Sequence, residues 1–129
     1  MGSVLDLAGR KLVQVALTCR DLDRARTFYR DRLGLPLLFE AGTMLFFDAA
    51  GQRLMVGLSE RKDQPIGGSY LYFDAPDIHA LAEALKARGV ELVGNIETLQ
   101  RTDTHELKLQ FFRDPDGNAL ALMGMVARD

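Results

Sequence analysis

The sequence lacks several features that would point to particular classes of function. Its single cysteine, Cys19, can form no disulfide within the chain and cannot hold a zinc ion alone, so we expect a cytoplasmic protein. Nowhere do about 18 apolar residues run together, so no membrane span is expected. The opening MGSVLDLAGRKLVQ also lacks the uninterrupted apolar run of a secretory signal.

Net charge and chain length narrow the range of expected partners and domain organisations. The formal net charge of −2 provides no field that would attract a polyanion, so neither nucleic acid nor an anionic membrane is an expected partner. With 129 residues, the chain has the usual length of one domain, and it can bury a proper core. A small neutral or weakly charged molecule fits better as a ligand.

The chain contains an internal repeat. VQVALTCRDLDRARTFYRDRLG, residues 13–34, aligns with SYLYFDAPDIHALAEALKARG, residues 69–89, so that Asp21 stands opposite Asp77. Each segment predicts a strand and then a helix, over residues 21–33 and 77–88. An aspartate caps each predicted helix, and Gly34 or Gly89 ends it.

A second pair of phrases extends the repeat. DAAG at residues 48–51 corresponds to DPDG at residues 114–117, and each predicts a tight turn followed by an alternating strand. The sequence therefore predicts one domain, residues 1–129, built from module one (about 11–58), a linker (59–68) and module two (about 69–125). Each module reads strand, helix and three strands, with strands at about 11–19, 35–40, 43–48, 52–58, 69–75, 90–97, 105–112 and 118–125.

Alternation along the strands separates two faces. The apolar face, expected beneath the helices, consists of Val13, Val15, Leu17, Leu54, Val56, Leu71, Phe73, Leu120 and Leu122. The other face mixes small, polar, flexible and aromatic residues: Gln14, Ala16, Thr18, Arg53, Met55, Gly57, Tyr70, Tyr72, Asp74, Ala119, Ala121 and Met123. This mixture is typical of a pocket wall, and a sheet face buried in a homodimer is the alternative.

The modules resemble those of the glyoxalase, bleomycin-resistance and extradiol-dioxygenase superfamily, called vicinal oxygen chelate proteins. The most specific phrases are VALTCRDLDRARTFYRDRLGL at residues 15–35 and FFRDPDGNALAL at residues 111–122. The resemblance implies an α+β fold of two βαβββ modules whose curled mixed sheets surround a cavity, commonly completed in a homodimer. It also implies a divalent metal bound from the first and last strands of each module.

The residues at the implied metal positions are poor ligands. The first-strand positions fall on Gln14, which is a tolerable ligand, and on Tyr70. The last-strand position of module one falls on Met55, and that of module two, where the superfamily almost always has Glu, falls on Ala121. A neutral phenol, a thioether and a methyl group do not suit a hard divalent cation, and one weak amide ligand does not hold a metal. We therefore expect no metal and no other cofactor.

Other polar residues offer weaker candidates. His79 is expected on the wet face of the second helix and His105 at the entry to a strand, so neither is expected to bind metal. Cys19 is expected to be a packed residue, because reactivity would need a lowered pKa.

The sequence thus predicts a metal-independent protein that binds a small organic molecule and forms a homodimer. The predicted ligand-binding residues are Gln14, Arg53, Met55, Tyr70, Tyr72, Ala121 and Met123. One alternative is a metal-dependent lyase or dioxygenase, similar to lactoylglutathione lyase, which would require a one-residue slip of two strands. Another is metal-free catalysis with Tyr70 or Asp74 as acid or base.

Overall fold

The computed structural model describes residues 5, 8, 10, 12–59 and 69–128, so the predicted linker lies outside the described residues except for Ser59. Module one consists of β1 (Gln14–Cys19), α1 (Leu22–Arg26), η1 (Thr27–Arg32), β2 (Leu37–Ala41), β3 (Met44–Ala49) and β4 (Gln52–Leu58). Module two consists of β5 (Tyr70–Asp74), α2 (Ile78–Ala87), β6 (Glu91–Arg101), β7 (His105–Arg113) and β8 (Ala119–Ala127).

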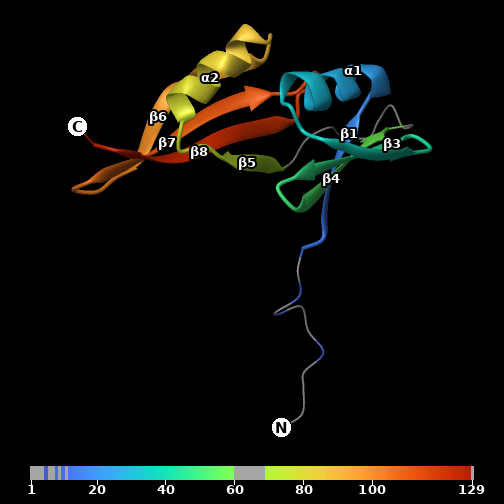
Figure 1. Cartoon of the computed structure of the whole chain (residues 1–129), viewed down its shortest axis with the longest axis horizontal. Coiled ribbons are helices and arrows are strands. Elements are labelled where there is room, and N and C mark those ends of the chain that lie inside the picture. Colours follow the sequence, from blue (N-terminus) through green and yellow to red (C-terminus); the bar gives the residue numbers. More distant parts are fainter. Residues whose placement is uncertain (1–4, 6–7, 9, 11, 60–68, 129) are drawn as a thin grey trace.

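Each module forms a four-stranded mixed sheet, in the order β1-β4-β3-β2 in module one and β5-β8-β7-β6 in module two. The first strand pairs in parallel with the last in both sheets, and the remaining pairs are antiparallel. Figure 1 shows the modules side by side, with both helices on the same side of the sheets. The predicted α+β fold is confirmed, and the two sheets are not closed on each other.

The two helices are capped differently. In the first helix, the Asp21 carboxylate caps as predicted by accepting from the amide of Arg24, 3.0 Å away. The predicted cap of Asp77 is wrong, because its side chain makes no capping hydrogen bond. The backbone of Asp77 (φ −98°, ψ 37°) lacks the extended conformation that aims a capping side chain at the first turn.

The first helix widens into a π-helix at η1. The amide of Leu33 donates to the carbonyl of Phe28 at 2.9 Å, five residues back instead of four. Within this wider turn, the consecutive side chains Phe28 and Tyr29 are both buried. Their rings meet edge to face at a centroid distance of 5.1 Å, and Tyr29 also contacts Phe47 of β3 at 5.6 Å.

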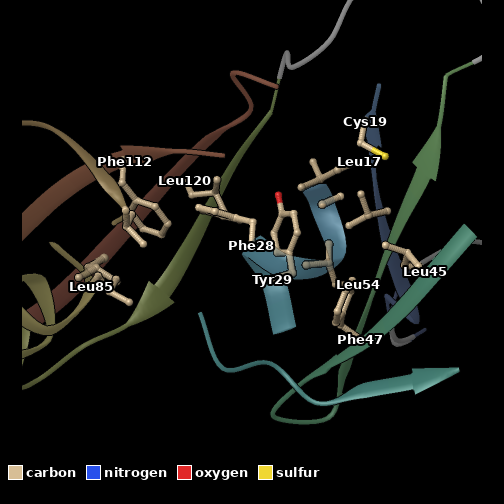
Figure 2. Close-up of a cluster of buried hydrophobic side chains, with 14 of the residues drawn as sticks. Leu17, Cys19, Phe28, Tyr29, Leu45, Phe47, Leu54, Leu85, Phe112 and Leu120 are labelled. Carbon is tan, nitrogen blue, oxygen red and sulfur yellow. The ribbon is translucent and has the colours of Figure 1, made fainter. Parts of the chain in front are cut away.

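The core lies between the helices and the predicted apolar sheet face. Leu17, Leu54, Val56, Leu120 and Leu122 are buried there, as predicted. In Figure 2, Phe28 and Tyr29 lie between the core residues of the two modules, so one core spans both. Val13 was assigned to this face wrongly: it precedes the first paired residue of β1 and is 74% exposed.

One glycine is required by close packing of backbone in module two. A Cβ added at Gly124 of β8 would lie 1.7 Å from the carbonyl oxygen of Ala75, directly after β5. At that point the amide of Ala75 donates to the carbonyl of Met123 at 2.8 Å. Gly124 thus lets the two backbones approach closely.

The turn at residues 114–118 joins the two modules. The buried carboxylate of Asp114 accepts from the hydroxyl of Tyr29 in module one at 2.8 Å. The Asp116 carboxylate accepts from Arg24, with the guanidinium nitrogen 2.8 Å away. The side-chain Nδ2 of Asn118 donates to the backbone carbonyl of Thr18 at 2.9 Å. The polar side chains at positions 114, 116 and 118 of this turn therefore all bind module one.

Asp114 also shapes its own turn. Its Oδ1 accepts from the backbone amides of Asp116 and Asn118 at 2.9 and 2.8 Å, and its Oδ2 accepts from the Asn118 side chain at 2.7 Å. With Tyr29, four donors surround one buried carboxylate. Such saturation compensates for removing the charge from water.

Candidate functional site

The sheet faces opposite the helices, here called the open faces, carry the predicted binding residues. In module one, Gln14 of β1 stands beside Arg53 of β4, and Met55 follows two residues later on the same face. Gln14 and Arg53 are exposed, and Met55 is half-buried. These three residues form one group.

The second group lies on module two. Tyr70 and Tyr72 of β5 stand beside Ala119 and Ala121 of β8, and Met123 follows along β8. The tyrosine rings lie roughly parallel, 6.3 Å apart, and remain 58% and 51% exposed. Ala121 lies between Tyr72 and Phe111 and has no exposed surface, so its small side chain provides room for those rings rather than contact area.

The register of the strands excludes the slip that the alternative function requires. Leu120 and Leu122 lie in the core, and the intervening Ala121 points to the open face. The predicted faces of β4, β5 and β8 are therefore correct. Since the sheets are not closed, the structure does not bring the groups of modules one and two together, and their role in binding remains a prediction.

Three phenylalanines of the open faces were missed by the sequence analysis. In module one, Phe39 and Phe46 stack with centroids 4.4 Å apart, and the Arg53 guanidinium lies 5.8 Å from each centroid. In module two, Phe111 meets Tyr70 edge to face at 5.9 Å. The pairs Phe46–Phe47 and Phe111–Phe112 were the available signal, because consecutive strand residues place one ring on each face.

A hollow of about 620 Å³ lies where module one meets β5. It is lined by Val15, Leu35, Ala49, Ala50, Gln52, Leu54, Tyr70, Leu71, Tyr72, Phe73 and Asp74. Its volume is typical of a small-molecule site, and its lining is mostly apolar with a few polar groups. Tyr70 and Tyr72 are thus the predicted residues that border a hollow, whereas Gln14, Arg53 and Met55 do not line it.

The residues at the implied metal positions do not fit a divalent cation. Gln14, Met55 and Tyr70 offer an amide, a thioether and a phenol, and Ala121 offers no donor atom. Within the described ranges, no three His, Cys, Asp or Glu side chains are grouped so that they could hold a metal ion. His79 and His105 are both exposed, on α2 and at the start of β7.

Cys19 is buried at the end of β1. Burial, and next the negative charge of Asp116, raise the pKa of its thiol to about 11. The thiol therefore stays protonated near neutral pH and is not an activated nucleophile, as the sequence analysis expected.

Comparisons with known proteins agree with this architecture. The family model described as "Glyoxalase/Bleomycin resistance protein/Dioxygenase superfamily" matches residues 11–122. The chain belongs to this superfamily. A search of curated proteins found no match.

Solved structures show the same fold. A glyoxalase/bleomycin resistance protein/dioxygenase from Alicyclobacillus acidocaldarius is 23% identical with a TM-score of 0.71, and 93% of each chain is covered. A lactoylglutathione lyase from Agrobacterium tumefaciens is 24% identical with a TM-score of 0.71, over 89% of this chain and 93% of that one. A superfamily member from Sphaerobacter thermophilus DSM 20745 is 23% identical with a TM-score of 0.73, over 88% and 96%.

Membrane insertion through helices is not indicated by the described part of the chain. Its helices are too short and insufficiently apolar to cross a bilayer.

Proposed function

We propose that this protein binds a small organic molecule without a metal or other cofactor. The observation that carries the proposal is the hollow of about 620 Å³ bordered by Tyr70 and Tyr72. The exposed rings supply stacking surface, and their hydroxyl groups supply hydrogen bonds. Apolar residues of both modules line most of the remainder of the hollow, so a flat molecule can bury most of its surface there.

The donor chemistry supports binding without a metal. The carboxylate that would give the last strand of module two a metal ligand is replaced by the methyl group of Ala121. A single amide, Gln14, is too weak to retain a divalent cation. The likeness to a lactoylglutathione lyase, at 24% identity, supports the fold and leaves the reaction to be tested.

We further propose that two copies assemble through the open faces. These faces expose large apolar side chains on both modules, including Phe39, Met44, Tyr70, Tyr72 and Met125. Apolar surface of this extent is typical of an interaction site. A second copy would cover it and further enclose the ligand.

Replacing Tyr70 with alanine should weaken the binding of a flat aromatic probe. We expect the affinity for acridine, measured by fluorescence titration, to fall about fivefold, because the variant loses a ring contact worth about 1 kcal/mol. Leu99→Ala is the matched control, since Leu99 is exposed on β6 and does not line the hollow. Equal affinity in the Tyr70 variant and the control would remove Tyr70 from the site.

Adding metal ions should leave the stability of the protein unchanged. A metal ion that binds the folded state raises its stability as the metal concentration increases. Because we propose that this chain binds no metal, we expect no rise in Tm as Ni, Zn, Mn or Fe is added after dialysis against a chelator. Gln14→Ala is the control, and it should behave like the wild type. A concentration-dependent rise that the Gln14 variant lacks would favour the metal-dependent alternative.

The mass in solution tests the assembly. We expect sedimentation equilibrium to give twice the chain mass of 14.3 kDa. Met44→Lys should reduce that mass, since it places a charge within an apolar interface. A mass of one chain at every concentration would contradict the proposed homodimer.

A further inference from the structure

The two turns related by the repeat differ in how they meet the opposite module. Residues 114–118 read DPDGN, and residues 48–52 read DAAGQ. In the first turn, Asp116 reaches module one with a side chain that is only 1% exposed. Its counterpart in the second turn is Ala50, which has only a methyl group. Within the described part of the chain, the ion pair that Asp116 makes with module one therefore has no equivalent at the second turn.

The hollow lies between the second turn, DAAGQ, and β5 of module two. Ala49, Ala50 and Gln52 of the second turn line it on one side, and Tyr70, Tyr72 and Asp74 of β5 line it on the other. The Asp48 carboxylate closes its own turn by accepting from the amide of Gly51 at 2.9 Å. Tyr29, which binds Asp114, aligns in the repeat with Leu85, which has no hydroxyl to donate to Asp48.

Among the described residues, Asp74 is the one charged residue that lines the hollow. It is exposed, and its carboxylate forms no hydrogen bond or ion pair with the described part of the chain. Arg53 lies between Gln52 and Leu54 on β4, so strand alternation directs it to the opposite face, where it packs over Phe39 and Phe46. No positively charged residue among the described lining therefore neutralises the charge of Asp74.

The two tyrosines, like Asp74, favour a positively charged ligand. Tyr72 precedes Asp74 by two residues on the same face of β5, and Tyr70 stacks beside Tyr72. The faces of aromatic rings attract cations, and a carboxylate next to them attracts the same charge. A planar organic cation would satisfy both features at once.

We propose that the hollow between the DAAGQ turn and β5 binds an organic cation with a flat apolar body, such as a protonated nitrogen heterocycle. The positively charged group pairs with the Asp74 carboxylate, and the flat body contacts Tyr70 and Tyr72. This inference rests on the proposed binding function and adds the location and charge of the ligand.

Three probes of the same shape separate charge from ring contact. Near neutral pH, 9-aminoacridine is a cation, acridine is neutral and acridine-9-carboxylate is an anion. We expect the wild type to bind the cation about fivefold more tightly than acridine, equivalent to about 1 kcal/mol, and the anion most weakly. Equal affinities for all three probes would contradict the proposal.

Asp74→Asn should abolish the preference for the cation and leave acridine binding unchanged. Asp103→Asn is the matched control, because it removes the same charge at an exposed position outside the hollow. Asp74 is exposed and unpaired among the described residues, so its replacement should leave folding intact, as circular dichroism would verify. A cation preference that survives in Asp74→Asn would overturn the assignment.

Ala49→Phe tests the location. The added ring should fill the hollow and weaken binding of the cation and of acridine at least fivefold, about 1 kcal/mol, while circular dichroism remains that of the wild type. Unchanged binding in a folded Ala49→Phe variant, together with loss in Tyr70→Ala, would place the ligand on the open face and contradict this inference alone. Failure of all three probes to bind the wild type would contradict both the inference and the proposed function.

Discussion

The junction between the modules depends on one buried carboxylate. Asp114 is 5% exposed and accepts four hydrogen bonds, three from its own turn and one from Tyr29. Burial raises the pKa of Tyr29 far above its ordinary value, and the negative charge of Asp114 raises it further, so the hydroxyl remains a donor. Because a buried charge without partners is costly, the fold is most stable when module one supplies this donor.

This constraint explains why the DPDGN phrase can persist without the acid of a metal site. Its aspartates and asparagine hold module two against β1 and the first helix, a role independent of any ligand. The equivalent DAAGQ turn lacks those side chains, and the hollow lies beside it. A duplicated module thus produces one filled junction and one junction with space for a small molecule.

Sequence patterns were sufficient to predict the architecture within each module. Alternation correctly sorted β4, β5 and β8 into two faces, and Asp21 and Gly34 bounded the first helix, because these signals are local. Asp77 was misassigned because capping depends on backbone angles that the residue type does not specify. The π-turn at η1 arises from burying Phe28 and Tyr29 together, which requires the tertiary core.

The candidate site was only partly predictable for the same reason. Tyr70 and Tyr72 followed from alternation along β5, but the hollow they border forms between modules whose relative position no local pattern specifies. The contact of Tyr29 with Asp114 joins residues 85 positions apart. Ala49 and Ala50 gave no chemical signal of their own, since their contribution is the space they leave.

The most direct test of this account is a double-mutant cycle between Tyr29 and Asp114. The free energies of unfolding in urea would be compared for the wild type, Tyr29→Phe, Asp114→Asn and the double variant. The account predicts a coupling of about 1.5 to 3 kcal/mol, the usual contribution of a hydrogen bond to a charged group. Effects that add to within about 0.5 kcal/mol would show that the two residues do not hold the modules together.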